Sequence, residues 1–189
     1  GQRFTAEHVL IATGGWPHIP EFPGSEFAIS SNEVFDLEHF PRRLAIVGGG
    51  YIAVEFAGIF NGLGAQVTQL YRGPLFLRGF DADIRAHAAQ EILKTGVDLR
   101  FEVNVASITR ELSGLQVLLT DGSTLEVDAV LYATGRKANL TGLGLENVNV
   151  SLNDMGNLEV DEQSCSSEPR IFALGDVTGG MELTPLALA

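Results

Sequence analysis

Cysteine is almost missing from this chain of 189 residues, which contains only Cys165. One cysteine cannot form an intrachain disulfide, so a small disulfide-stabilised secreted scaffold is excluded and we expect a cytoplasmic protein. Cys165 has no C-x-x-C-type neighbour, and the four histidines follow no metal-ligand spacing. We therefore expect no metal site.

Long apolar runs and basic residues are also scarce. No apolar run approaches the roughly 18 residues that a membrane-spanning helix needs, so we expect no membrane segment. Lys and Arg number 12 against 24 Asp and Glu, which gives a formal charge of −12 and argues against binding nucleic acid or an anionic membrane. With 45% hydrophobic residues, the chain can bury a sizeable core.

The most informative stretch runs from Leu44 to Asp81 and is typical of a strand, a glycine turn, a helix and a second strand. Its GGGYIA sequence fits the G-x-G-x-x-[GA] dinucleotide fingerprint. Gly48 permits the tight turn after the strand, Gly50 lets the backbone approach a pyrophosphate, and Ala53 lets the helix pack closely. The phosphates would lie at the helix N-terminus, where unpaired N–H groups favour an anion. The alternative is a glycine-rich turn in another α/β fold.

The end of the second strand indicates which cofactor binds. An NAD-specific site has an acid about 20 residues beyond the first glycine, to bind the ribose hydroxyls. Here no acid occurs between Glu55 and Asp81, and the only charged residues in that interval are Arg72 and Arg78. Two guanidinium groups suit a 2′-phosphate, so the sequence favours NADP(H). The alternative is that both arginines lie on an ordinary solvated loop.

The remaining pattern predicts an α/β fold around this unit. We expect a helix from Asp81 to about Thr95, and a short helix between residues 32 and 39. We expect buried strands at 7–13 and 128–134, a third parallel strand at 97–101 and a further strand at 170–174. An antiparallel meander is expected at 105–109, 115–120 and 124–127. Three strand ends carry similar sequences, ATG at 12–14, ATG at 133–135 and LGD at 174–176. The carboxyl edge of a sheet is where doubly wound folds bind ligands.

The phrases ATGGWPHIP, VGGGYIAVEFAGIF, LRGFD, YATGRKAN and GDVTGGMELTP resemble the pyridine nucleotide–disulfide oxidoreductase family, and its glutathione-reducing members most closely. The resemblance covers nearly the whole chain. It implies a Rossmann-like NADPH domain at residues 25–140, with a central parallel sheet, helices on one face and the meander on the other. Residues 1–24 and 141–189 would be pieces of an FAD domain that pair with each other.

The resemblance also implies roles for individual residues. Tyr51 would be a lid over the nicotinamide pocket, and Glu55 a buried carboxylate at its nicotinamide end. Without the resemblance, core packing for Tyr51 and a solvated helix face for Glu55 are the simpler interpretations. The other expected NADPH residues are Gly48, Gly49, Gly50, Ile52, Arg72, Arg78 and Gly135. The expected FAD residues are Thr13, Gly14, Asp176, Leu183 and Thr184.

By the same resemblance, the parent enzyme would be a homodimer that uses NADPH and FAD to reduce oxidised glutathione. The chain has no second glycine fingerprint for the ADP part of FAD and no cysteine pair. We therefore expect an internal segment of a longer enzyme, inactive alone, with the dimer interface in an absent C-terminal domain. Two alternatives stay open: reduction of another small disulfide, such as trypanothione or glutathione amide, and a non-catalytic NADPH-binding module. An NAD-linked dihydrolipoamide dehydrogenase fits less well, because Tyr71-Arg72 replaces its acid.

Overall fold

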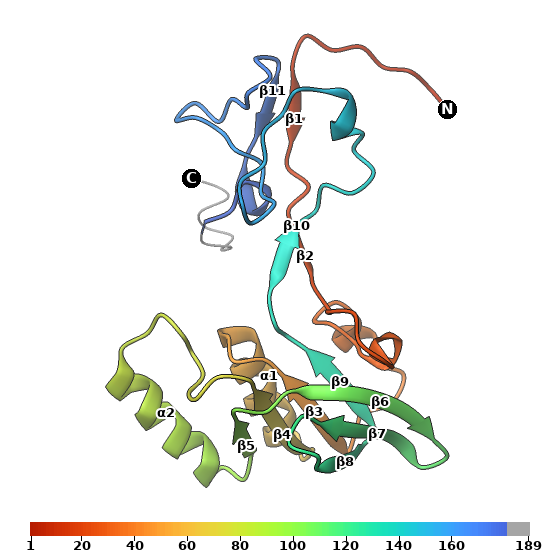
Figure 1. Cartoon of the computed structure of the whole chain (residues 1–189), viewed down its shortest axis with the longest axis vertical. Coiled ribbons are helices and arrows are strands. Elements are labelled where there is room, and N and C mark those ends of the chain that lie inside the picture. The colour runs from red at the N-terminus through yellow and green to blue at the C-terminus, as the bar shows by residue number, and fades with distance from the viewer. Residues whose placement is uncertain (181–189) are drawn as a thin grey trace. The chain divides into compact units, whose positions relative to one another are not determined.

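A computed structural model describes residues 1–180 of the chain (Figure 1). The chain forms two compact units. One consists of residues 17–135, and the other combines residues 1–16 with those from 136 onward. The larger unit contains the predicted glycine turn, and the smaller one contains the first and last of the predicted strands.

A four-stranded parallel sheet, in the order β5-β4-β3-β9, forms the centre of the larger unit. Its strands are β3 (Arg43–Val47), β4 (Gln66–Tyr71), β5 (Asp98–Phe101) and β9 (Ala129–Tyr132). The four last residues of β3 are all buried, as expected of a central parallel strand covered on both faces. The predicted parallel sheet is thus confirmed.

Both α-helices belong to the larger unit and cover one face of this sheet. Helix α1 (Tyr51–Gly62) buries Ala53 and Ala57 against Leu44 and Ile46 of β3. Helix α2 (Ala82–Lys94) packs Ile92 against the same cluster. Asp81 caps α2 as predicted, since its carboxylate accepts a hydrogen bond from the Asp83 N–H at 2.9 Å.

The antiparallel meander covers the opposite face, also as predicted. It consists of β6 (Val105–Glu111), β7 (Gly114–Leu119) and β8 (Thr124–Val127), in the order β6-β7-β8. Alternate residues of β7 are buried and pack with Ala45 and Val47 of β3. Successive residues of β3 therefore point alternately to the helices and to the meander.

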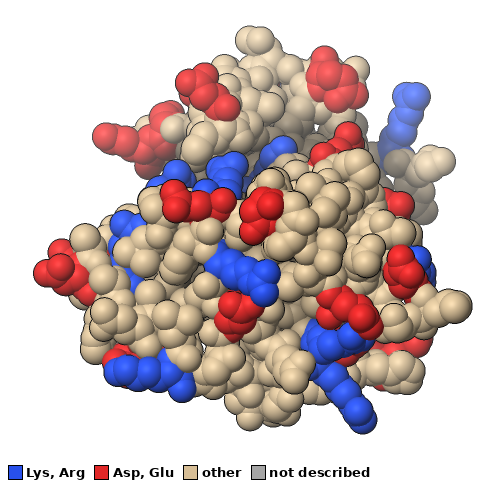
Figure 2. Space-filling model, turned by 60° about the horizontal axis from the view of Figure 1, so that its bottom comes forward, with Lys and Arg blue, Asp and Glu red and all other residues tan. Residues whose placement is uncertain are grey.

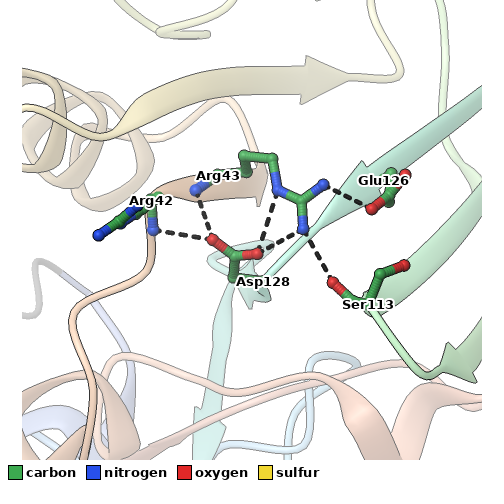
Figure 3. Close-up of polar contacts among 5 residues, drawn as sticks. All are labelled: Arg42, Arg43, Ser113, Glu126 and Asp128. Atoms are coloured by element: carbon green, nitrogen blue, oxygen red, sulfur yellow. Dashed lines mark hydrogen bonds and ion pairs between the residues drawn. The ribbon is translucent and has the colours of Figure 1, made fainter.

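An ion-pair cluster connects the start of β3 to the region between β8 and β9 (Figure 3). Arg43 lies 2.6 Å from the Asp128 carboxylate and 2.7 Å from that of Glu126, and it also donates to the Ser113 carbonyl. The backbone N–H groups of Arg42 and Arg43 donate to Asp128 Oδ2 at 2.9 Å. These bonds hold the amino ends of β3 and β9 together.

The smaller unit contains a parallel pair formed by β1 (Val9–Ile11) and β11 (Ile171–Ala173). The expected pairing of the two flanks is therefore present. The prediction of a buried strand at residues 7–13 is wrong, because Val9 and Leu10 are exposed and only Ile11 is buried. A two-stranded sheet covers its two faces less completely than the central sheet does, so an apolar run here does not ensure burial.

The other elements are short. Strands β2 (Gly15–Pro17) and β10 (Arg136–Ala138) pair with each other. The 3₁₀ helices are η1 (Ser25–Phe27), η2 (Glu33–Asp36), η3 (Leu145–Asn147) and η4 (Gly175–Thr178). The helix expected at residues 32–39 is thus a single 3₁₀ turn, shorter than predicted.

Candidate dinucleotide site

The glycine turn between β3 and α1 has the geometry that the fingerprint predicts at its first position. Gly48 has φ +147°, and a Cβ there would lie 2.2 Å from the Ala133 carbonyl oxygen of the β9 segment. Its N–H donates to the Leu70 carbonyl of β4 at 2.9 Å. Gly48 thus sits between two neighbouring segments, and no larger residue fits there.

The next two glycines differ from each other. A Cβ on Gly49 would lie 2.4 Å from Cδ2 of Tyr71, whereas a Cβ on Gly50 would meet nothing within 4 Å. Gly50 is exposed and is the N-cap of α1, and neither a capping side chain nor an acid occupies this end of the helix. Open space therefore adjoins the start of α1, where the N–H groups of the first helical turn have no acceptor within the helix and favour an anion.

Tyr71 ends β4, at the position where an NAD-specific site has its acid. Its ring lies between two glycines, since a Cβ on Gly73 would lie 2.7 Å from Tyr71 Cε1. The sequence pattern did not predict this arrangement, because it depends on contacts between separate segments. The closeness of Gly49 and Gly73 to the ring brings the end of β4 directly beside the glycine turn.

Arg72 is the first residue of the loop after β4, and Arg78 lies near the end of this loop. Both arginines are exposed. Neither makes an ion pair with a residue in the described part of the chain. The loop is joined to the glycine turn by a hydrogen bond of 2.6 Å from the Leu77 N–H to the Gly49 carbonyl. A loop that contacts the glycine turn therefore carries two guanidinium groups that have no ion-pair partner among the described residues.

Packing under the loop restrains it further. Phe76 is fully buried and stacks on Phe101 of β5 with ring centroids 5.7 Å apart. Arg85 of α2 donates from Nε to the Phe76 carbonyl at 2.7 Å, and from its terminal nitrogen to the Leu75 carbonyl. The sequence pattern did not identify Phe76 or Arg85 as supports of this loop, and no local signal marks them.

The expected nicotinamide residues lie on the first two turns of α1. Tyr51 and Glu55 are exposed and Ile52 is half-buried, whereas Ala53 faces the core. The buried carboxylate that the resemblance implied at Glu55 is not found, because the apolar stripe of α1 lies on another side of the helix. Gly135 has φ +141°, and a Cβ there would meet nothing within 4 Å.

The expected flavin residues belong to the smaller unit. The Thr13 hydroxyl donates to the Asn139 carbonyl at 2.6 Å, and the Gly14 carbonyl accepts from the Asn139 N–H at 2.8 Å. Asp176 is half-buried in η4, and its Cβ lies 3.6 Å from the position of a Cβ on Gly15. Leu183 and Thr184 lie outside the described residues.

Charge alone does not mark the site. On the face shown in Figure 2, acidic and basic side chains are interspersed, so the net negative charge does not form one continuous field there. Within residues 1–180, no three His, Cys, Asp or Glu side chains come together as metal ligands. None of the described helices is long and apolar enough to cross a membrane. The arrangement of the glycine turn and the arginine loop is what singles out this region.

Two curated relatives match almost the whole chain. A glutathione reductase from Burkholderia cepacia is 52% identical over 100% of this chain and 42% of its own length. A trypanothione reductase from Trypanosoma congolense is 45% identical over 99% of this chain and 39% of its own length. The chain thus spans about two fifths of the length of these relatives.

Solved structures share the fold. The HOCl-induced flavoprotein disulfide reductase of Escherichia coli is 35% identical, covers 96% of this chain and 42% of its own, and superposes with a TM-score of 0.90. An engineered water-forming NADPH oxidase, solved with NADPH bound, is 28% identical, covers 92% of this chain and 40% of its own, and has a TM-score of 0.82. Its substitutions remove an aspartate and introduce two arginines six positions apart.

The family described as pyridine nucleotide-disulphide oxidoreductase matches residues 1–189. This match agrees with the fold, in which a parallel sheet carries the dinucleotide turn and the two flanks pair in a separate small unit. The chain belongs to the pyridine nucleotide-disulphide oxidoreductase family.

Proposed function

We propose that this chain binds NADPH at the glycine turn and at Arg72 and Arg78, as part of an FAD-dependent disulfide reductase of the glutathione reductase type. The observation that carries the proposal is the loop after β4, which presents two arginines without ion-pair partners among the described residues. A 2′-phosphate is the group that distinguishes NADPH from NADH, and guanidinium groups bind it through charge-assisted hydrogen bonds.

The engineered oxidase supports this assignment of the arginines. It binds NADPH with two introduced arginines six positions apart and with an aspartate removed. Arg72 and Arg78 have the same separation, and no acid lies between Glu55 and Asp81. The two chains thus share the pattern of charges that a 2′-phosphate site requires.

The remaining expected residues would complete the nucleotide site. Gly49, Gly50 and the first turn of α1 would bind the pyrophosphate through backbone N–H groups. Tyr51 and Glu55, exposed on the same turns of α1, would lie at the nicotinamide end, with Ile52 beside them and Gly135 at the edge of the sheet. Glu55 is exposed and has no ion-pair partner among the described residues, so we propose that it pairs with a basic side chain from outside residues 1–180.

Bound FAD would supply two-electron chemistry between NADPH and a disulfide. The described residues fit only part of this cofactor. Asp176 offers a half-buried carboxylate, which suits a ribityl hydroxyl, while Thr13 and Gly14 form a turn fixed by Asn139. We propose residues 1–24 and 141–189 as the FAD-domain pieces, and residues 25–140 as the NADPH domain.

Oxidised glutathione is the proposed substrate, since a glutathione reductase is 52% identical to this chain. NADPH, a proton and one glutathione disulfide would give NADP⁺ and two thiols. Trypanothione disulfide is the second candidate substrate, because a trypanothione reductase is 45% identical to this chain. A homodimer in the cytoplasm completes the proposal and rests on the family resemblance.

The proposal is tested by supplying the complete flavoenzyme with NADPH and, in parallel, oxidised glutathione or trypanothione disulfide. We expect consumption of NADPH with glutathione disulfide and a much lower kcat/KM with NADH. Turnover with trypanothione disulfide alone would transfer the assignment to the second candidate. No turnover with either disulfide would contradict the reductase assignment.

A further inference from the structure

Gln69 of β4 is a polar residue in the apolar layer between the sheet and the helices. It is 2% exposed, and its register partners are Ile46 of β3 and Leu99 of β5, which both pack in the helix-facing cluster. Its amide Nε2 donates to the Gly48 carbonyl at 3.0 Å. Its Oε1 is buried and has no hydrogen-bond partner among the described residues.

Such a side chain is costly to keep in a core. A buried acceptor without a partner loses its hydration without compensation, whereas an apolar residue of similar size has no such loss. Packing therefore does not account for Gln69. The one contact that its amide makes is with the first residue of the glycine turn, so its role lies there.

That contact and a second hydrogen bond fix the peptides on both sides of Gly48. The Gly48 N–H donates to Leu70, and the Gly48 carbonyl accepts from Gln69, so two successive residues of β4 hold both polar groups of Gly48. In a planar trans peptide the C=O and the following N–H point in opposite directions. The Gly49 N–H is therefore directed away from Gln69, and no described residue accepts its proton.

We propose that Gln69 is a positioning residue that orients the Gly48–Gly49 peptide for binding the cofactor pyrophosphate. By holding the Gly48 carbonyl inward, it keeps an oxygen away from the approaching phosphate and leaves the Gly49 N–H as a donor. Without the amide, the peptide can rotate and present its carbonyl to the anion. This inference rests on the proposed NADPH site.

The test compares Gln69→Met with Gln66→Met in the complete protein, by titration with NADPH. The first variant removes the buried amide at nearly constant length, and the second makes the same change at an exposed position at the start of β4. We expect the Kd to rise about two- to tenfold for Gln69→Met, the effect of one neutral hydrogen bond, and to stay unchanged for Gln66→Met. The Tm should change little, because Gln69→Met removes a buried unpaired acceptor along with the hydrogen bond.

A second variant, Gln69→Glu, gives a pH profile that a purely structural role would not produce. Burial raises the pKa of the introduced carboxyl, which is neutral below that pKa and can then donate to the Gly48 carbonyl. Above it the carboxylate repels both the carbonyl and the phosphates. The ratio of the variant's Kd to that of wild type should therefore increase with pH.

The outcomes separate the two claims. Wild type that binds no NADPH would contradict the proposed function itself. If wild type binds NADPH and Gln69→Met binds it with the same Kd, the positioning role is overturned. If Gln69→Met does not fold, the pH profile decides, and a Kd ratio for Gln69→Glu that is independent of pH would overturn the role.

Discussion

The ring of Tyr71 lies so close to Gly49 that a Cβ on this glycine would come within 2.4 Å of Tyr71 Cδ2. This contact joins the glycine turn to the end of β4, where the proposed 2′-phosphate site begins. The loop bearing Arg72 and Arg78 begins at the next residue and returns to Gly49 through the Leu77 N–H. The parts of the chain proposed to bind the pyrophosphate and the 2′-phosphate are therefore in direct contact.

Substituting Gly49 and Gly50 separately should distinguish packing from binding. Gly49→Ala meets the Tyr71 ring and should lower stability by about 1–3 kcal/mol, as overpacking does. Gly50→Ala meets nothing within 4 Å, so it should keep the wild-type Tm but weaken NADPH binding where the Cβ meets the pyrophosphate. Thermal unfolding and NADPH titration of both variants measure this.

The double variant Gly49→Ala/Tyr71→Ala supplies the control. Removing the ring should restore most of the stability that Gly49→Ala loses, which a double-mutant cycle detects as a coupling energy. If the stability losses of the two single variants simply add in the double variant, the Tyr71 ring is not what excludes a Cβ at position 49.

Arg72→Ala/Arg78→Ala should change cofactor preference. Each charge-assisted contact contributes about 1.5–3 kcal/mol, so losing both should weaken NADPH binding by roughly 10²-fold or more and leave NADH unaffected. Arg42→Ala is the matched control. Arg42 is also an exposed arginine, but it precedes the start of β3, whereas the glycine turn follows the end of that strand. Equal losses with NADPH and NADH would reject contact with the 2′-phosphate.

The cluster around Arg43 predicts how stability depends on pH. Burial alone would raise the pKa of Asp128, but hydrogen bonds from Arg43 and Arg42 outweigh it and lower that pKa, and hydrogen bonding to Arg43 lowers the pKa of Glu126. A carboxylate whose pKa is lower in the folded state stabilises the fold above its unfolded pKa, and the stabilisation is lost as pH falls through the folded pKa. Stability should therefore decrease below about pH 4.

Asp128→Asn tests that prediction. The variant should lose about 1 kcal/mol at neutral pH, a value discounted for the partial exposure of the pair, and its stability should fall less steeply in acid. Glu126→Gln, at the more exposed partner, should have a smaller effect. Urea unfolding between pH 3 and 7 gives both quantities, and an unchanged acid slope for Asp128→Asn would contradict the role of the cluster.

The 189-residue chain by itself should bind NADPH without reducing oxidised glutathione. A disulfide relay needs two cysteines, and the chain contains one. The complete enzyme is the control in an absorbance assay at the NADPH band. Turnover by the 189-residue chain would show that the reductase chemistry does not require residues outside it.

The sequence predicted the central fold well because each element there carries a local signal. The GGGYIA turn follows the apolar residues 44–47 of β3, Asp81 is a strong N-cap, and β7 of the meander alternates buried and exposed residues. Where burial depends on partners distant in sequence, as at Val9 and Leu10, the local pattern was misleading.

The candidate site likewise has residues that local sequence predicts and residues that only tertiary contacts reveal. The fingerprint and the missing acid predict a site at the turn and the two arginines from local sequence alone. The supports of the site came from tertiary contacts: Tyr71 between two glycines, Arg85 under the loop, and Gln69 on the Gly48 carbonyl. No spacing rule relates these residues to the turn, so only the structure reveals them.

Parallel calorimetric titrations of the protein with NADPH and NADH measure its cofactor preference directly. We expect NADPH to bind more tightly by roughly 10²-fold, and added salt to reduce the difference because contacts with the 2′-phosphate would be ionic. NADH binding as tightly as NADPH would contradict the assignment of this segment as an NADPH site.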